Sequence, residues 1–303
     1  MQQEFTGLLL IDKESGITSH GVVEQVRRIL RSKRVGHTGT LDPQATGLLI
    51  LCVGKATKIT RFLNEEPKVY RADCHLGVTT DSLDMTGEVL ERREVQVEDE
   101  RIRNAFQAVR GKFEQMPPMV SALKHQGKPL YTYARAGIEV ERNPRPVEIF
   151  DLAVEGIERQ GEVKVAFTVR CSRGTYIRSL CDELGTQLGC GGAMGALRRL
   201  GAGRFSVDEA VTLDRLQEMG SEDLPLLDLG EALADLPALK VNARALRAVA
   251  NGLPLKPVMV AGRLELPEVG EFVRVLSPEG KLLAVHEVTS GTHTWVTRTV
   301  RVI

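Results

Sequence analysis

The sequence of 303 residues predicts an α+β protein with a second, smaller β domain at its C-terminus. Short apolar or alternating segments are typical of strands, and two segments place apolar residues at helical spacing. The composition changes after Pro237, where mainly short strand-like pieces follow. Apolar residues make up 42% of the chain, enough for a substantial core. We therefore expect two units, residues 1–237 and residues 238–303.

The N-terminal unit begins with a predicted strand, helix and strand. Gly7–Ile11 is a buried strand, and Ser19–Leu30 is an amphipathic helix with Ser19 as its N-cap. Leu48–Val53 is a second buried strand. Further along, Val69–Leu76 and Val163–Cys171 alternate as half-buried strands do, and Thr175–Leu188 is helical with Thr175 as its cap.

Residues 111–147 interrupt this pattern with five prolines, several glycines and many basic side chains. Only Leu130–Ala136 reads as a short helix there, and a long insert of this kind is usually functional or mobile. In the C-terminal unit we expect a helix over Ala243–Ala250, a turn at Ser277–Gly280, and four strands. These strands are Pro257–Val260, Phe272–Leu276, Leu282–Val288 and Thr294–Ile303, and their spacing predicts a small barrel or sandwich.

The charge is balanced overall, with 40 basic and 40 acidic residues. A zero net charge weakly disfavours a nucleic-acid partner, but the distribution of charge matters more than its sum. Residues 27–34 carry five cations and no acid, and a second basic patch at Leu197–Leu200 and Arg204 follows the glycine-rich segment Gly189–Gly195, expected to be flexible. Either patch is consistent with phosphate contacts or with a solvated surface.

The cysteines point to a reducing compartment. There are five of them, they are scattered, and none has zinc-ligand spacing, so we expect buried free thiols and no metal site. The apolar run near the N-terminus is too short for a signal peptide, and no later run reaches membrane-spanning length. We expect a cytoplasmic protein without a membrane partner, and a monomer by default.

The most informative stretch is the glycine loop Gly36–Gly47, which reads GHTGTLDPQATG. Glycine lets a backbone approach a ligand closely, and Asp42 is the only carboxylate in the loop. Asp before Pro is also a common helix start, so Asp42 could simply be an N-cap. A strand-like run follows instead, which favours the alternative that Asp42 is a nucleophile for an electron-poor ring carbon or a sugar anomeric carbon.

Two other segments carry candidate site residues. Tyr70 lies on the apolar face of its strand, where it is a core residue or a ring that stacks on a base. Tyr176 and Arg178 lie at the start of the helix that follows Ser172–Gly174. This position suits anion binding or an ion pair between Arg178 and a carboxylate such as Asp42.

Together these segments resemble the bacterial tRNA pseudouridine-55 synthases. The glycine loop resembles the signature of that family, and further motifs occur in family order over about residues 6–215. They are Leu8–Lys13 with Gly16, Lys68–Arg71, Met116–Pro118 with Ser121–Lys124, Gly174–Arg178 and Leu197–Leu200. The C-terminal unit is similar, more loosely, to a PUA-type RNA-binding domain.

The resemblance implies a pseudouridine-synthase fold, with a central, mostly antiparallel sheet flanked by helices and a small PUA-like barrel. It also implies isomerisation of one uridine in the tRNA T-loop, without cofactor or metal, on a base flipped out of the stack. By this resemblance Asp42 is the catalytic aspartate, Arg178 pairs with it, and Tyr70 stacks on the target base. Tyr176 and Leu197 line the uracil pocket, and His37 takes up space vacated by flipped bases. The 111–147 insert overlaps an RNA-gripping loop.

Two alternatives stay open at this point. One is a non-catalytic RNA-binding or RNA-folding protein that needs the basic patches but not an ionised Asp42. The other is a small-molecule enzyme that cradles a phosphate in the glycine loop. Against the second, the loop lacks the Gly-Lys-Ser/Thr ending of a P-loop, and no Gly-x-Gly-x-x-Gly pattern is present.

Overall fold

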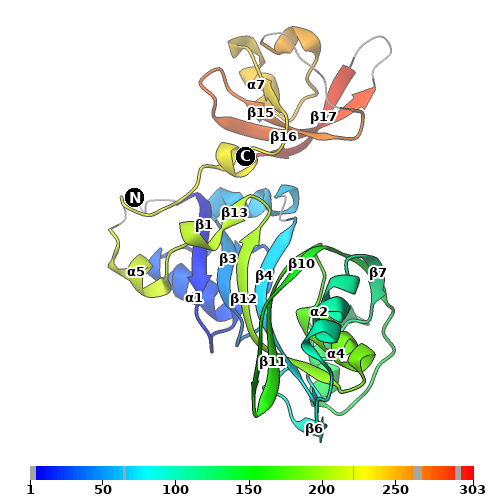
Figure 1. Ribbon diagram of the computed structural model, residues 1–303. Coiled ribbons are helices and arrows are strands. Elements are labelled where there is room, and N and C mark those ends of the chain that lie inside the picture. The colour runs from blue at the N-terminus through cyan, green and yellow to red at the C-terminus, as the bar shows by residue number, and fades with distance from the viewer. Residues whose placement is uncertain (1–4, 64–65, 221, 262–267, 291–294) are drawn as a thin grey trace.

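The computed structural model describes residues 5–63, 66–220, 222–261, 268–290 and 295–303. Its main feature is a nine-stranded sheet in the order β1-β3-β12-β4-β11-β10-β7, with β2 added beside β3 and β13 beside β12 (Figure 1). Every neighbouring pair is antiparallel except β3 and β12, which are parallel. The strands are β1 (Gly7–Lys13), β2 (Val35–His37), β3 (Thr46–Val53), β4 (Lys68–Leu76), β7 (Gly111–Gln115), β10 (Arg145–Gln160), β11 (Glu162–Cys171), β12 (Gly192–Ala202) and β13 (Phe205–Ser206).

One face of this sheet is covered by helices α1 (Ser19–Ile29), α2 (Asp99–Ala108) and α4 (Ile177–Leu188). Side chains of β3 alternate in direction, so Leu49 and Leu51 pack against α1. The alternation predicted for residues 69–76 is confirmed, because Tyr70, Ala72, Cys74 and Leu76 are all buried in the core with α2 and α4. The α+β prediction is therefore confirmed.

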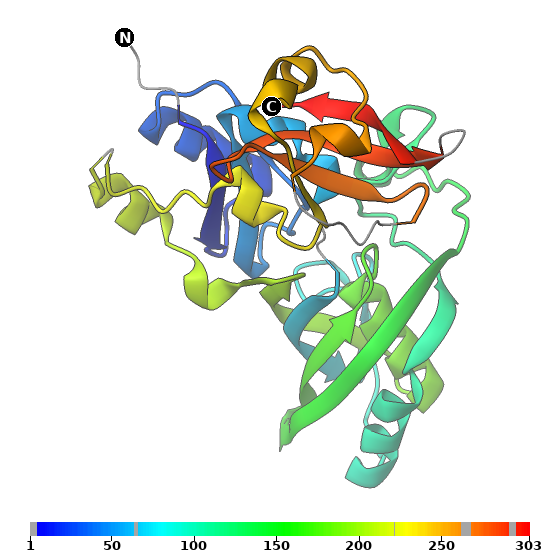
Figure 2. The same cartoon turned by 90° about the horizontal axis from the view of Figure 1, so that it is seen from above.

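The other face carries the C-terminal part of the chain. A second sheet is formed by β14 (Ala238–Lys240), β15 (Phe272–Leu276), β16 (Leu282–Ser290) and β17 (Trp295–Val302), in that order. Leu282 and Val285 of β16 pack into one cluster with Leu8 and Ile50 of the large sheet. Figure 2 shows the same arrangement from above, with the C-terminal sheet over β1 and β3.

The remaining elements are short. They are β5 (Val78–Thr80), β6 (Val89–Arg92), β8 (Lys124–His125), β9 (Lys128–Pro129), α3 (Leu130–Arg135), α5 (Leu213–Glu218), α6 (Leu229–Ala232), α7 (Leu246–Ala250), and 3-10 turns that include η1 (Gly54–Lys58), η2 (Thr60–Phe62) and η5 (Pro257–Met259). Among the described residues, no helix has the length and apolar character needed to cross a membrane. All five cysteines are buried and free, as predicted.

Several local predictions are wrong. Thr18, not Ser19, caps α1 by accepting from the Gly21 amide. Thr175 does not cap α4, because α4 begins at Ile177 and Tyr176 occupies its N-cap position. Residues 257–259 form a 3-10 turn in place of a strand, since Pro257 begins the turn. Of the last predicted strand, Thr294 lies outside the described residues.

Two segments expected to be irregular are partly ordered into the large sheet. Gly192–Gly195 belongs to β12, a central strand, instead of a flexible link. Gly192 must pack against α4, where a Cβ would lie 2.5 Å from the Cys181 carbonyl oxygen. The 111–147 insert begins with β7 and ends in β10, so only residues 116–144 lie outside the large sheet.

Candidate active site

The segment around Asp42 is residues 38–45, between β2 and β3, and a buried lysine holds its C-terminal half. Lys13 at the end of β1 has no exposed surface, and its Nζ donates to the carbonyl oxygens of Pro43 at 2.9 Å, Ala45 at 2.6 Å and Glu14 at 2.9 Å. Burial lowers the pKa of Lys13 to about 8, although the charge of Asp42 acts in the opposite direction. The turn after Asp42 is thus tied to the core.

Arg199 on β12 holds the other half of the loop. It is 2% exposed, and it donates to the carbonyls of Leu48 at 2.6 Å and Gly39 at 3.3 Å. Gly47 lies directly against this strand with φ +97°, and a Cβ there would be 2.2 Å from the Arg199 carbonyl oxygen. Arg199 therefore does not belong to the basic surface expected for residues 197–200 and Arg204, because it is buried, whereas Arg198 pairs with Asp12 at 2.7 Å and Arg204 is exposed.

Helix α1 positions the residue before Asp42. The Ser19 hydroxyl donates to the Leu41 carbonyl at 3.0 Å and accepts from the Leu41 amide at 2.8 Å. No helix follows Asp42, since the Ala45 amide closes a turn onto the Asp42 carbonyl and β3 begins at Thr46. The interpretation of Asp42 as a helix cap is therefore wrong.

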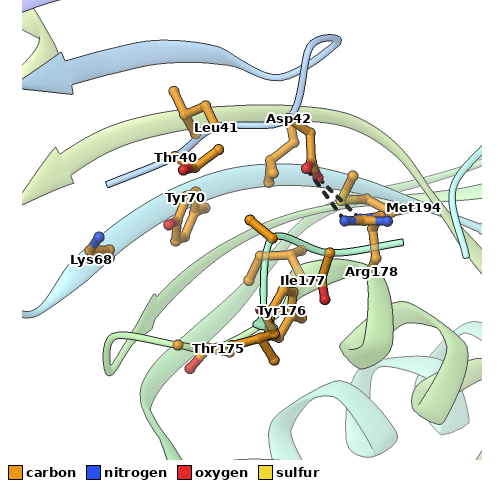
Figure 3. A pocket seen from close by; sticks show the side chains of 15 residues that line it. Thr40, Leu41, Asp42, Lys68, Tyr70, Thr175, Tyr176, Ile177, Arg178 and Met194 are labelled. Atoms are coloured by element: carbon orange, nitrogen blue, oxygen red, sulfur yellow. Dashed lines mark hydrogen bonds and ion pairs between the residues drawn. The ribbon is translucent and has the colours of Figure 1, made fainter. Parts of the chain in front are cut away.

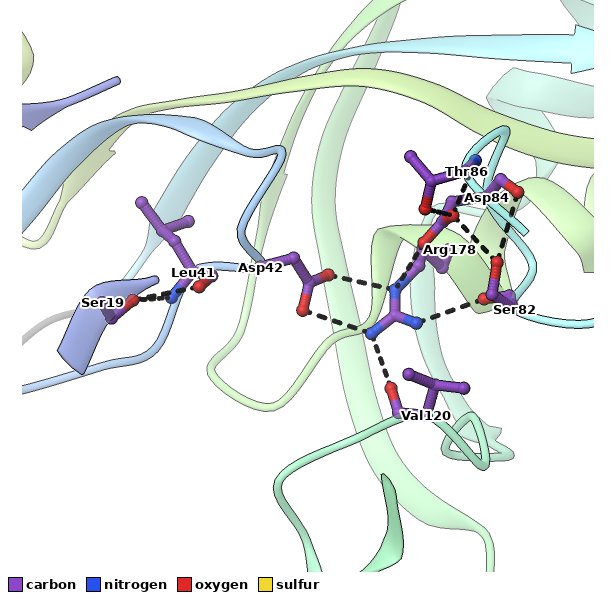
Figure 4. Close-up of polar contacts among 8 residues, drawn as sticks. All are labelled: Ser19, Leu41, Asp42, Ser82, Asp84, Thr86, Val120 and Arg178. Carbon is purple, nitrogen blue, oxygen red and sulfur yellow. Dashed lines mark hydrogen bonds and ion pairs between the residues drawn. The ribbon is translucent and has the colours of Figure 1, made fainter. Parts of the chain in front are cut away.

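Asp42 forms an ion pair with Arg178 on α4 (Figure 4). Nε of Arg178 lies 3.1 Å from Oδ2 of Asp42, and Nη2 donates to Oδ1 at 3.3 Å. The guanidinium also donates to the carbonyls of Ser82 at 3.1 Å and Val120 at 2.8 Å. The Arg178 side chain is only 5% exposed, whereas Asp42 is 40% exposed. A fixed, buried cation thus orients a carboxylate that stays open to a ligand.

A second carboxylate stands behind Arg178, and the sequence analysis missed it. Oδ2 of Asp84 is 3.8 Å from Nε of Arg178. Its other oxygen accepts from the Ser82 hydroxyl at 2.8 Å and from the Thr86 amide at 3.0 Å, in a turn where Leu83 adopts φ +63°. A bulky residue in this region is strained, which often accompanies a constrained site.

Asp42 and Arg178 open onto a cavity of about 330 Å³ (Figure 3). Tyr70 of β4, Tyr176 and Leu197 of β12 form part of its wall. Tyr70 is 8% exposed, and burial raises the pKa of the Tyr176 phenol, so both side chains are largely withdrawn from water. Ser121, Ala122 and Leu123 of the insert also line the cavity.

Gln115, at the end of β7, anchors this wall and was not predicted. It is 1% exposed, its Oε1 accepts from the Tyr176 amide at 2.8 Å, and its Nε2 donates to the Tyr176 carbonyl at 3.1 Å. The Ser179 hydroxyl donates to the Met116 carbonyl at 2.9 Å beside it. Together with the Val120 contact, these bonds join the base of the insert to the first turn of α4.

Five of the six predicted site residues come together at this cavity: Asp42, Tyr70, Tyr176, Arg178 and Leu197. His37 does not line it and lies at the end of β2, five residues before Asp42. The residues that the sequence missed, including Lys13, Asp84 and Gln115, act over long sequence separations or through backbone groups. Lys13 and Ser121 belong to motifs quoted above, which was the one signal available for them.

Comparisons with known proteins identify the family of the chain. Residues 27–177 match the TruB family pseudouridylate synthase (N terminal domain), and residues 178–234 match the tRNA pseudouridylate synthase B C-terminal domain. The chain is 42% identical over 287 residues to the tRNA pseudouridine synthase B of Syntrophotalea carbinolica, covering 94% of this chain and 92% of that one. It is 45% identical over 252 residues to the Geobacter sulfurreducens protein of the same name, covering 82% of each.

Solved structures show the same fold. The chain resembles a protein chain of an H/ACA RNP bound to a substrate RNA, with a TM-score of 0.74, 24% identity and 98% of this chain and 84% of that chain covered. A chain of the archaeal Nop10-Cbf5 complex matches with the same TM-score and identity over 98% of this chain and 85% of that one. The fold and the matched family define a pseudouridine synthase. More narrowly, the chain belongs to the TruB family.

Proposed function

We propose that this enzyme converts uridine 55 in the T-loop of tRNA to pseudouridine, with Asp42 as the nucleophile. The observation that carries the proposal is the exposed Asp42 carboxylate, held by the buried Arg178 at the mouth of a cavity walled by Tyr70. The relatives named tRNA pseudouridine synthase B support tRNA as the substrate. We also propose that the enzyme works in the cytoplasm as a monomer.

The reaction is an isomerisation whose atoms balance without an external reactant. Asp42 forms a transient covalent bond to the target nucleotide, and the bond between N1 of uracil and C1′ of the ribose breaks. The freed base turns within the cavity so that C5 faces C1′, and a C5–C1′ bond forms. The bond between Asp42 and the nucleotide breaks, which restores the carboxylate. The proton on C5 leaves and N1 gains one, so nothing is oxidised or hydrolysed. The reaction therefore calls for no cofactor.

The target base must leave the RNA stack to reach Asp42, which costs on the order of a few kcal/mol. We propose that the Tyr70 ring stacks on the flipped uracil while Tyr176 and Leu197 complete the pocket wall. His37, outside the cavity, would fill space that the flipped bases leave. Residues 116–144 of the insert would grip the T-arm, and the bonds from Arg178 to Val120 and from Ser179 to Met116 attach the base of the insert to the site.

We further propose that residues 1–237 form the catalytic domain and residues 238–303 a PUA-like RNA-binding domain. The start of the second sheet at Ala238 supports this division. The contribution of the C-terminal part to function would be affinity for tRNA, since the cavity is lined by residues from Thr40 to Leu197 alone.

Mapping pseudouridine in tRNA transcripts tests the proposal. The enzyme is incubated with an unmodified transcript and with a matched transcript in which position 55 is cytidine, and pseudouridines are located by chemical labelling and primer extension. We expect one pseudouridine, at position 55, in the first transcript and none in the second. Modification at another position, or equal modification of both transcripts, would contradict the proposed specificity.

A further inference from the structure

The basic stretch 27–34 lies away from the catalytic carboxylate, at the far end of α1. Ser19, in the first turn of α1, is hydrogen-bonded to Leu41 next to Asp42 (Figure 4). The helix is 11 residues long, so its C-terminal cations lie about 16 Å from the catalytic loop. Helices α1 and α4 cover the same side of the large sheet, and the cavity lies on that side as well.

Arg31 occupies a position that normally belongs to glycine. The Ser32 amide bonds to the Arg27 carbonyl at 3.1 Å and the Arg31 amide to the Arg28 carbonyl at 3.3 Å, which is a Schellman ending of α1. Arg31 is the left-handed residue of this motif, with φ +48°, and its side chain is exposed. An exposed arginine here strains the backbone without packing in return, so its charge needs another explanation.

A second element brings more cations to the same place. The Gly54 amide, at the start of η1, donates to the Arg34 carbonyl at 2.8 Å. This bond places exposed Lys55 beside the segment that carries exposed Lys33 and Arg31. Two separate parts of the chain therefore converge on one basic surface, formed by Arg28, Arg31, Lys33 and Lys55, which we call the α1-end surface.

Several other basic residues of the protein are paired with carboxylates. Arg27 pairs with Glu24 at 2.6 Å, Arg71 with Glu155 at 2.9 Å and Arg198 with Asp12 at 2.7 Å. No ion pair joins any residue of the α1-end surface to another described residue. The helix dipole accounts for Arg28 in the last turn of α1, but Arg31, Lys33 and Lys55 lie outside that helix. Their mutual repulsion is relieved most naturally by a polyanion.

We propose that the α1-end surface binds the phosphates of a helical stem of the substrate tRNA while the loop of that RNA occupies the cavity. The inference rests on the proposed function, which supplies an RNA partner. Phosphate contacts position an RNA without reading its sequence. They require only exposed positive charge, which the four cations of the α1-end surface supply. A contact at the end of α1 that lies far from the catalytic loop would align the stem and favour RNAs that carry one beside the target loop.

Replacing Arg31 tests this separately from catalysis. In Arg31→Gly the strain disappears, so the melting temperature should be unchanged or higher. The Kd for full-length tRNA should rise about threefold or more, and the slope of log K against log salt should fall by about one. Arg31→Asn, whose side chain tolerates the left-handed conformation, should weaken binding equally. The single-turnover rate at saturating enzyme should stay at the wild-type value.

Arg103→Gln is the matched control, since Arg103 is an exposed cation on α2 at a distance from this surface. It should leave the Kd and the salt slope unchanged. Wild-type affinity in both Arg31 variants, or equal weakening by Arg103→Gln, would overturn the proposal. The proposal would also be overturned if the Arg31 variants raised the Kd for a T-loop hairpin with a shortened stem as much as they raise the Kd for full-length tRNA. A wild-type enzyme that modifies no tRNA would instead contradict the proposed function.

Discussion

At the scale of single residues, the site depends on three buried cations with different tasks. Lys13 and Arg199 hold backbone carbonyls of the loop, and Arg178 holds the Asp42 side chain. Arg178 uses the planar fork of its guanidinium, because it contacts Asp42 and the carbonyls of Ser82 and Val120 at once. A lysine carries the same charge but cannot make these contacts together.

Arg178→Lys should therefore lower the single-turnover rate on the order of 100-fold, because a small misplacement of the nucleophile is costly. The affinity for tRNA should change little. Arg198→Lys is the matched control, since Arg198 makes a bidentate pair with Asp12 outside the cavity, and it should retain nearly full activity. Equal rates in the two variants would show that the geometry at Arg178 does not limit the reaction.

Lys13 gives a second prediction at this scale. Lys13→Met removes three hydrogen bonds to buried or partly buried carbonyls, each left unsatisfied at about 1–3 kcal/mol. Relief from burying a charge offsets part of this, so we expect a net loss of a few kcal/mol in the free energy of unfolding. Urea unfolding at pH 7 measures it. A variant as stable as the wild type would show that the hydrogen bonds of Lys13 do not stabilise the loop.

At the scale of elements, the base of the insert and the start of α4 behave as one unit. Gln115 forms this link through the amide and carbonyl of Tyr176, which neither chain segment could make alone. Gln115→Met should leave the Tyr176 amide unpaired, destabilise the protein by about 1–3 kcal/mol and slow turnover. Affinity for tRNA should fall less than turnover.

Gln115→Glu tests the same link by pH. A neutral glutamic acid can accept from the Tyr176 amide and donate to its carbonyl, whereas the carboxylate cannot donate. Burial raises the pKa of the neighbouring Glu183 to about 7, and a carboxyl at position 115 would share that environment. Activity of the variant relative to wild type should therefore be higher at pH 6 than at pH 8. The same activity ratio at both pH values would contradict a role for the bond from residue 115 to the Tyr176 carbonyl.

Some elements and site residues could be predicted from the sequence, and others could not. Strong periodicity identified β4, β11 and α4, and the glycine loop identified Asp42. The strand β10 was missed because a bulge between Ile149 and Asp151 leaves Phe150 and Asp151 exposed one after the other, which interrupts its alternation. The bond between Gln115 and Tyr176 joins residues 61 positions apart, and Lys13 reaches the loop across 30 positions. Such contacts depend on the folded topology, which local pattern does not contain.

At the scale of the whole molecule, the C-terminal sheet is packed onto the large sheet. Leu282 and Val285 lie in one cluster with Leu8 and Ile50, and Phe272 meets Phe62 edge to face at 5.2 Å. Deleting residues 238–303 would expose this cluster. The truncated chain should melt at a lower temperature and associate in solution, as calorimetry and gel filtration would show. A monomeric fragment with the wild-type melting temperature would contradict this packing.

The C-terminal sheet should also weaken in acid. His286 has no exposed surface, its ring bonds to Thr297 at 2.7 Å, and burial lowers its pKa from 6.5 to about 4. Between these values the unfolded chain binds the proton and the folded chain does not. Stability should fall as pH drops from 6.5 to 4, by about 3 kcal/mol at most. His286→Gln should lose this slope in urea unfolding followed by circular dichroism, and an unchanged slope would contradict it.

The most direct test of the account is the Asp42→Asn variant, whose side chain keeps nearly the same shape without the charge. Release of tritium from tRNA carrying 5-tritiated uridine is measured under single-turnover conditions, alongside the Kd for the same RNA. We predict that tritium release is abolished while the Kd stays within about tenfold, because phosphate contacts carry most of the affinity. Tritium release at a rate near that of the wild type would show that Asp42 is not the nucleophile.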